Sequence, residues 1–281
     1  MIKLEKLLGE VTNAAGVNAG STGGQVIPKA IILAGAPGAG KGYVLKGLNL
    51  SGLPILNIDN TYIENLKKAN VSLDLKNATP EERSKQARAM ADANKEFAGK
   101  VEKTIEGKKS FILDGTAASY KKTEALVQEL KKAGYEVFML YVYTDLERSL
   151  KQNELRFQAS GGKDRSLAPA IVLKTWNSVT QNYAPYRELF GDNNFISVAN
   201  TLEDEKLEDL EAIKDKYLKP YDPKDTKPKS AARARYSAKQ KEKVDNELRK
   251  LLSATGVKDI IDNSVSKEEA QSKLSQFLKG E

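Results

Sequence analysis

The 281-residue chain contains no cysteine and no histidine. Without cysteine it can form no disulfide and offers no thiol nucleophile. Without histidine it has neither a Ser-His-Asp triad nor the usual ligands of a zinc site. Phosphoryl transfer needs none of these groups, because it depends on positioning and on charge stabilisation. The composition therefore excludes several large enzyme classes and leaves phosphoryl transfer open.

Long apolar runs are also absent. No run approaches the roughly 20 residues that a membrane-spanning helix needs. The amphipathic N-terminus, MIKLEKLLGEV, contains two glutamates and is a poor match to a signal peptide. We therefore expect a soluble cytoplasmic protein without a membrane contact. The length suffices for one α/β domain of about 200 residues with additional segments.

The most informative segment is rich in glycine. Residues 35–42 read GAPGAGKG, and they follow the apolar run KAIILA at residues 29–34. Gly35, Gly40 and Lys41 match the phosphate-loop spacing G-x-x-x-x-G-K between a strand and a helix. Small residues allow backbone N–H groups to curl around a polyphosphate, and Lys41 adds a positive charge beside the terminal phosphates. The segment predicts binding of a nucleoside triphosphate.

Two other interpretations of these glycines fit the spacing less well. If the segment were a turn that binds no ligand, its match to the phosphate-loop spacing would be a coincidence. The dinucleotide-binding pattern G-x-G-x-x-G, counted from Gly38, requires glycine where the chain has Tyr43. The predicted nucleotide contacts are Gly35, Ala36, Pro37, Gly38, Ala39, Gly40, Lys41, Gly42 and Tyr43.

Strands and helices are predicted to alternate along the chain. Apolar runs predict strands at residues 30–34, 53–58, 110–113, 137–143 and 195–198. Helical patterns follow at about residues 60–69, 79–107 and 119–133, after a capping pair formed by Thr144 and Glu147, and from about residue 168. Such alternation implies an α/β fold with a parallel sheet that helices cover on both faces.

Composition divides the chain into three parts. An N-terminal helix and a glycine-rich linker occupy residues 1–28, the main domain residues 29–219, and a C-terminal extension residues 220–281. The extension opens with a linker rich in proline and lysine, and helices are expected at about residues 237–253 and 267–278.

The extension also holds a basic region. Lys224–Lys250 contains ten Lys or Arg and four Asp or Glu. This region is a candidate contact for nucleic acid or for a protein partner. An exposed basic helix face is the alternative explanation.

Two aspartates follow predicted strands. Asp59 ends the second strand and Asp114 ends the third. Because the carboxyl ends of parallel strands meet at the ligand-binding edge of a sheet, both should lie near Gly35. Asp114 is the candidate ligand for Mg²⁺, and Asp59 is the candidate general base for an attacking hydroxyl. The alternatives are a turn aspartate before Gly115 and the N-cap of the next helix.

A basic segment at residues 145–165 resembles a mobile lid, with a helix that ends in two glycines. Arginines on a lid can fold over the transferred phosphoryl group and exclude water. Arg156 and Arg165 are the candidates for this role. For Arg148 and Lys151 we expect charges in solvent at the end of a helix.

Other conspicuous side chains have structural explanations as well as functional ones. Trp176 shares its spacing with Val172 and Val179, so it is expected in the core rather than as a platform for a base. Arg83, Lys85 and Arg88 lie on the long helix between the second and third strands, and they are candidates for an acceptor site. A charged outer helix face would explain these three residues equally well.

Together these motifs resemble the adenylate-kinase-like branch of phosphate-loop (P-loop) kinases. The resemblance rests on the GAPGAGKG loop, the Ile58-Asp59 strand end, the Leu113-Asp114-Gly115-Thr116 turn and the Arg156…Arg165 segment. Within this branch the chain is most similar to zeta-toxin-like and polynucleotide-kinase-like kinases, including those of tailed bacteriophages, over about residues 30–199. The resemblance implies a three-layer P-loop NTPase fold with a five-stranded parallel sheet. It also implies that the strand of Asp114 lies beside the loop strand, that ATP is the donor and that Asp59 is the base.

One position departs from these kinases. They tolerate glycine after the lysine but normally place Thr or Ser next, where this chain has Tyr43. A phenol is too long to replace a short hydroxyl on the metal or a phosphate. Either water completes the Mg²⁺ shell, or turnover is weak and the protein mainly binds nucleotide.

The sequence therefore predicts an ATP- and Mg²⁺-dependent kinase that phosphorylates a hydroxyl. The acceptor remains open among a nucleotide, a sugar nucleotide, a polynucleotide end and a small metabolite. If a phage encodes the chain, its location is the host cytoplasm. The alternative is a nucleotide-binding protein of weak activity that recruits a partner through its basic tail.

Overall fold

The computed structural model describes residues 27–48, 53–75, 78–161, 164–165, 167–201 and 256–280. The strands are β1 (Lys29–Ala34), β2 (Ile55–Asn57), β3 (Phe111–Asp114), β4 (Glu136–Tyr143) and β5 (Phe195–Ala199). The helices are α2 (Lys41–Gly47), α3 (Ile58–Lys68), α4 (Pro80–Glu106), α5 (Tyr120–Lys132), α6 (Leu146–Ala159), α7 (Pro169–Gln181), α8 (Tyr183–Phe190), α11 (Gly256–Asp262) and α12 (Lys267–Lys279). The predicted N-terminal helix, the basic region Lys224–Lys250 and the helix at 237–253 lie outside the described residues.

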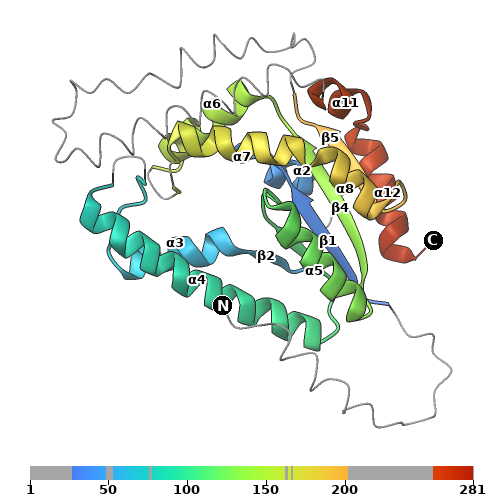
Figure 1. Ribbon diagram of the computed structural model, residues 1–281, viewed down its shortest axis with the longest axis horizontal. Helices are drawn as coiled ribbons and strands as arrows, with labels where there is room; N and C mark the ends of the chain where they lie inside the picture. The colour runs from blue at the N-terminus through green and yellow to red at the C-terminus, as the bar shows by residue number, and fades with distance from the viewer. Residues whose placement is uncertain are drawn as a thin grey trace.

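The strands form one sheet in the order β2-β3-β1-β4-β5, and each neighbouring pair is parallel (Figure 1). The α/β fold with a five-stranded parallel sheet is therefore confirmed. The strand of Asp114 lies beside the loop strand, with Leu33 in register with Asp114. Every residue of β1 is buried, as expected for the central strand of a sheet covered on both faces.

Helices cover the two faces of the sheet. Alternate residues of β1 point to opposite faces, so that Ile32 packs with α5, α7 and α8 while Ile31 packs on the other side. On that other side the sheet is covered by α2 and by α12, although these helices lie more than 200 residues apart in the sequence (Figure 1). Helix α12 is thus part of the main hydrophobic core.

Trp176 lies in the core, as predicted from its spacing. Its side chain is only 1% exposed, and its indole Nε1 donates a hydrogen bond of 2.7 Å to the carbonyl of Thr144. Val172 and Val179 are buried in the same cluster. The indole therefore serves packing between α7 and the sheet and is closed to a nucleotide base.

Helices α3 and α4 pack against each other beside the sheet, around a small cluster that includes Leu66 and Ala93 (Figure 1). The predicted capping box of α4 is confirmed. Thr79 accepts a hydrogen bond from the N–H of Glu82, and the Glu82 carboxylate accepts one from the N–H of Thr79. These bonds satisfy donors that a helix start leaves free.

Two local predictions were wrong. The second strand is shorter than predicted, because Asn57 caps α3 and places Ile58 and Asp59 in the first turn of that helix. Asp145, and not Thr144, caps α6 by accepting a hydrogen bond from the N–H of Arg148. The Thr144 hydroxyl instead donates to the carbonyl of Asn200, because the end of β4 lies beside the end of β5.

The short helices α8 and α11 were not predicted from the sequence. None of the helices in the described ranges is long and apolar enough to cross a membrane.

Candidate active site

The glycine-rich loop joins β1 to α2 at the carboxyl edge of the sheet. Gly38 and Gly40 have φ angles of 79° and 78°, in the left-handed region that disfavours other residues. A Cβ atom on Gly38 would also lie 2.6 Å from the carbonyl oxygen of Ser149, and one on Gly40 would overlap the amide of Asn200. The path of the loop therefore requires glycine at both positions.

Lys41 turns its side chain back over the loop. Its Nζ donates hydrogen bonds to the carbonyls of Gly35, at 2.9 Å, and Ala36, at 3.2 Å. Burial lowers the pKa of Lys41, and the nearby carboxylates of Asp114 and Asp59 oppose that shift. The ammonium group thus lies at the mouth of the loop, in the electrostatic field of both predicted aspartates.

Asn57 connects the two aspartates. Its Nδ2 donates a hydrogen bond of 2.6 Å to Oδ2 of Asp114, and its Oδ1 accepts one of 2.7 Å from the N–H of Asp59. Burial raises the pKa of Asp114, while Lys41 and the Asn57 hydrogen bond lower it. One side chain therefore fixes the end of β3 relative to the start of α3.

Arg165 reaches the predicted base directly. Its Nη2 lies 2.5 Å from Oδ2 of Asp59, and its guanidinium carbon lies 5.9 Å from the centre of the Tyr62 ring. Arg156 forms an ion pair with Asp164 and is half exposed. Positive charge from both arginines lowers the pKa of Lys41, so both lie within electrostatic reach of the loop.

Helix α6, the first part of the predicted lid, packs on the loop. The Ser149 hydroxyl donates a hydrogen bond to the carbonyl of Pro37. Lys151 is exposed, as expected, but Arg148 differs from expectation because its Nη1 is buried. Asp145, Leu146 and Ser149 beside it are buried as well, so the first turn of α6 is largely closed to solvent.

Tyr43 lies on the outer side of the loop helix. Its side chain is 64% exposed, and Nζ of Lys267 in α12 lies 4.2 Å from the centre of its ring. The position where related kinases carry a short hydroxyl is therefore occupied by a ring that contacts the C-terminal helix.

The Asp114 carboxylate fits a magnesium ion that would be shared with a nucleotide. No group of three or more acidic side chains suitable for a metal occurs within the described ranges, and the chain has no histidine or cysteine. Mg²⁺ is commonly held by one or two carboxylates together with substrate phosphates and water. Asp114, at the strand end facing Lys41, offers such a carboxylate.

Comparison with known proteins identifies the family. Residues 19–190, which include the loop, both aspartates and both lid arginines, match the family model described as Zeta toxin. The chain belongs to the zeta toxin family. The predicted resemblance is thus confirmed, and the chain has a zeta-toxin-like P-loop kinase fold, which is consistent with a nucleotide-dependent kinase. The link to bacteriophages stays a prediction. No curated protein sequence matches the chain.

Several solved structures resemble this zeta toxin family member at low identity. The AvrRxo1-ORF1:AvrRxo1-ORF2 complex gives a TM-score of 0.48 at 17% identity, over 64% of this chain and 56% of that one. The PezAT toxin–antitoxin system of Streptococcus pneumoniae gives a TM-score of 0.39 at 17% identity, over 89% of this chain and 95% of that one. The Pnkp1/Rnl/Hen1 RNA repair complex gives a TM-score of 0.43 at 15% identity, over 59% of this chain and 49% of that one.

Three residues that surround the loop were missed by sequence reasoning. They are Asn57, Ser149 and Asn200. Asn200 donates a hydrogen bond of 2.9 Å to the carbonyl of Ala39 and so braces the loop from the end of β5. Asn57 and Asn200 each stand at a strand end, which is a signal that could have been used. Ser149 lies within a helix, and its sequence context gives no such signal.

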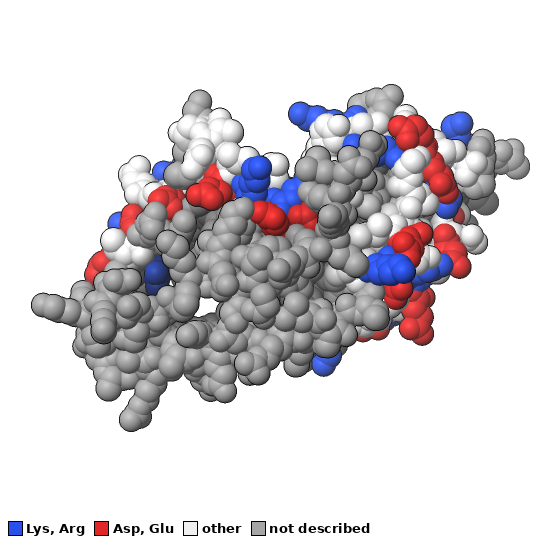
Figure 2. All heavy atoms as spheres, turned by 90° about the horizontal axis from the view of Figure 1, so that it is seen from above, with Lys and Arg blue, Asp and Glu red and all other residues white. Residues whose placement is uncertain are grey.

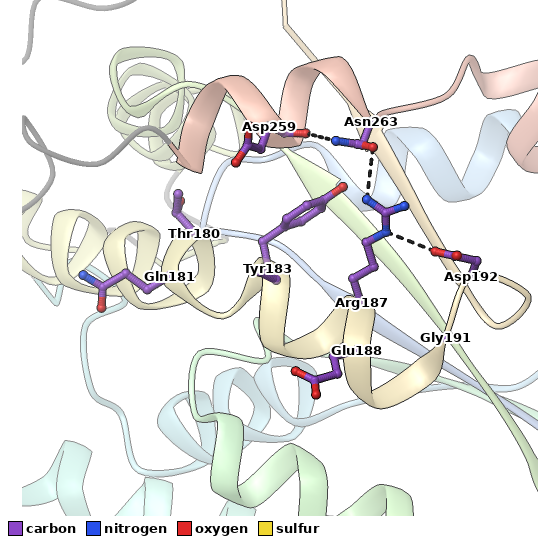
Figure 3. A pocket seen from close by; sticks show the side chains of 10 residues that line it. Thr180, Gln181, Tyr183, Arg187, Glu188, Gly191, Asp192, Asp259 and Asn263 are labelled. Atoms are coloured by element: carbon purple, nitrogen blue, oxygen red, sulfur yellow. Dashed lines mark hydrogen bonds and ion pairs between the residues drawn. The ribbon is translucent and has the colours of Figure 1, made fainter.

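Among the hollows of this zeta toxin family member that lie away from the loop, two lie between helices. One, of about 640 Å³, lies between α7, α8 and α11, where Arg187 pairs with Asp192 and donates to Asn263 (Figure 3). The other, of about 1000 Å³, lies between α3 and α4 and is lined by Lys85 and Arg88 of the predicted acceptor residues. Arg83 is exposed.

The charges of the family member are not segregated on the visible described surface. In the view of Figure 2, basic and acidic side chains of the described residues alternate over the face. The acceptor role of Arg83, Lys85 and Arg88 stays a prediction.

Proposed function

We propose that this chain is an ATP- and Mg²⁺-dependent kinase that transfers the γ-phosphoryl group to a hydroxyl of an acceptor. The observation that carries the proposal is the meeting of Lys41, Asp59 and Asp114 at the mouth of the loop, with Arg165 on Asp59. These groups come from four distant segments of the chain. Their chemistry is that of a site that holds phosphates, binds a cation and accepts a proton.

Each residue has a role in this proposal. Lys41 and the loop N–H groups bind the phosphates, and Asp59 accepts the proton of the acceptor hydroxyl. Asp114 would hold Mg²⁺, which when bound neutralises charge on the β- and γ-phosphates. Arg156 and Arg165 stabilise the charge of the transferred group and exclude water.

The ion pair between Arg165 and Asp59 implies an order of events. While the guanidinium is paired with Asp59, the Oδ2 atom of that carboxylate is occupied and is not free to accept the proton of a hydroxyl. The γ-phosphate carries more negative charge than a carboxylate and competes for Arg165. Binding of ATP would therefore release Asp59 for the acceptor.

The test is transfer of labelled phosphate from ATP to a panel of acceptors. The panel contains nucleotides, sugar nucleotides, short polynucleotides and a metabolite extract. Lys41→Ala should abolish both ATP binding and transfer. Asp59→Asn should bind ATP within about threefold of the wild type, a difference below 1 kcal/mol, and transfer at least about 100-fold more slowly, because the proton acceptor is lost while Lys41 and the loop N–H groups are kept.

The matched control is Asp262→Asn, since Asp262 is exposed on α11 and far from the loop in the sequence. This variant should transfer phosphate at the rate of the wild type. Full activity in Asp59→Asn would refute the role of Asp59 as the base.

A second candidate is a nucleotide-binding protein of weak activity that recruits a partner. The exposed ring of Tyr43, in place of a short hydroxyl, favours it. Tight ATP binding without transfer to any acceptor would support this function over the kinase. In that case the basic region Lys224–Lys250, which lies outside the described residues, is the proposed contact for a protein or nucleic acid. Loss of that contact on deletion of the region would support its role.

A further inference from the structure

A lysine from the C-terminal helix lies beside the proposed nucleotide site. Nζ of Lys267, the first residue of α12, lies 4.2 Å from the centre of the Tyr43 ring. Tyr43 is only two residues beyond Lys41, in the first turn of α2. Within the described part of the chain, no carboxylate forms an ion pair with Lys267. In that part of the chain its ammonium group therefore contacts the Tyr43 ring and no carboxylate.

The carboxylates that follow Lys267 are exposed and have partners in their own turn of α12. Hydrogen bonds from the Glu268 backbone N–H and from Ser266, together with the weaker influence of the Lys267 charge, lower the pKa of Glu268. Glu269 pairs with Lys273 one turn later, at 3.1 Å. The ammonium of Lys267 is thus the charged group of this turn that faces the loop helix.

The start of α12 is fixed at the ligand-binding edge of the sheet. The N–H of Val265 donates a hydrogen bond of 2.8 Å to the carbonyl of Ser197, in the middle of β5, and Ser197 is in register through Tyr141 with Ala34, the last residue of β1 before the loop. Ala270 and Leu274 are buried in the same cluster as Ala39 of the loop. Because the helix is anchored on both the sheet and the loop, the position of Lys267 does not depend on a flexible tail.

The far end of α12 is anchored as well. The Lys29 ammonium donates a hydrogen bond to the carbonyl of Phe277, and it lies 4.6 Å from the centre of the Phe277 ring. The helix therefore runs from the ligand-binding edge of the sheet to the opposite edge, and only its first turn lies near the loop.

We propose that Lys267 is a further nucleotide-binding residue, which contacts the α- or β-phosphate of ATP from the outer side of α2. This inference rests on the proposed function. The Tyr43 ring would hold the ammonium in place through a cation–π interaction. Lysine is a suitable ligand, because its compact charge binds phosphate oxygens without strict geometry. Tyr43 then has a function of its own, as the support for a cation from another part of the chain.

The first test compares the ATP affinity of the full-length chain with that of two variants by isothermal titration calorimetry. Lys267→Gln should weaken ATP binding by about three- to tenfold at low salt, the effect of losing one partly solvated charge. The difference should shrink at high salt because exposed charges are screened. Lys279→Gln, a matched loss of one exposed lysine at the other end of α12, should leave ATP affinity unchanged.

A double-mutant cycle tests the support by Tyr43. Tyr43→Ala should weaken binding, and Tyr43→Ala/Lys267→Gln should be weakened less than the sum of the two single changes. Additive effects of the two changes would refute the support by Tyr43.

Two outcomes separate this inference from the kinase proposal. If the wild type binds ATP and Lys41→Ala does not, unchanged affinity in Lys267→Gln overturns the role of Lys267 and leaves the kinase proposal intact. If the wild type binds no ATP, both are overturned. Thermal unfolding of each variant without nucleotide shows whether a loss of affinity comes from misfolding.

Discussion

Gly40 and Gly42 are two positions apart, but their backbone conformations and the space around them differ. Gly40 has a φ of 78°, and a Cβ atom there would overlap the side chain of Asn200. Gly42 lies within α2, and a Cβ atom there would meet nothing within 4 Å. The loop conformation requires glycine at position 40, whereas position 42 could also hold alanine.

Substitution by alanine should separate the two positions. Gly40→Ala should destabilise the fold by at least about 1–2 kcal/mol, because a left-handed conformation is costly for alanine and the loop must also move. Gly42→Ala should stabilise it by up to about 1 kcal/mol, because alanine favours helix. Urea unfolding followed by circular dichroism measures both. Equal changes in the free energy of unfolding at the two positions would contradict the difference between their backbone conformations.

The ion pair between Arg165 and Asp59 could not be predicted from either residue alone. Both residues were predicted as catalytic, the first as a clamp and the second as a base. The structure adds that the two side chains form an ion pair, with 2.5 Å between Nη2 of Arg165 and Oδ2 of Asp59. Residue identities suggest the separate roles, while the structure shows that these two residues are in contact.

At the scale of elements, the position of helix α12 differs most from what the sequence predicted. The capping pair Ser266 and Glu269 predicted the start of this helix, and Ser266 does accept a hydrogen bond from the Glu269 N–H. Its place on the sheet beside α2 was not predicted, since about 55 undescribed residues separate it from β5. The division of the chain at residues 219 and 220 stays a prediction, but the core includes residues from both sides of it.

Truncation of a buried leucine in α12 tests whether this helix belongs to the core. Leu274→Ala should lower the free energy of unfolding by about 2–5 kcal/mol, because Leu274 is fully buried against the sheet. The transition should remain a single cooperative step in urea. Leu155→Ala on α6, where the leucine is 41% exposed, is the control and should cost less than about 1 kcal/mol. A separate early transition in the Leu274 variant would show that α12 unfolds independently.

At the scale of the whole molecule, the sheet gathers groups that are far apart in the sequence. The order β2-β3-β1-β4-β5 places the loop strand between the strand of Asp114 and β4, the strand that leads to α6. A ligand at this edge would contact segments from at least four elements. Binding should therefore stabilise the entire domain and not only the loop.

ATP with Mg²⁺ should raise the free energy of unfolding by about 2.7 kcal/mol at a ligand concentration about 100 times Kd. Thermal unfolding with and without nucleotide measures the effect. Excess EDTA should reduce the stabilisation, since Asp114 would then face the phosphates without the cation between them. The Lys41→Ala variant is the control and should show no stabilisation. A shift of the same size in that variant would place nucleotide binding elsewhere.

The amino-acid sequence by itself determined the features that depend on neighbours along the chain. Alternating apolar runs and caps predicted the five strands, the long helix α4 and the α/β class, because local hydrogen bonding and side-chain periodicity set these elements. The spacing of Gly35, Gly40 and Lys41 predicted the loop for the same reason, since the glycines and the lysine act on one continuous turn.

Only the tertiary structure decided which distant residues meet. Asn57 bridges Asp114 and the start of α3, and Lys267 lies over Tyr43, because the sheet order and the packing of α12 bring them together. Sequence spacing contains no information about such contacts, since they depend on how separately formed elements bury their apolar faces. The composition and the loop thus predicted a phosphate site, and the packing defined what surrounds it.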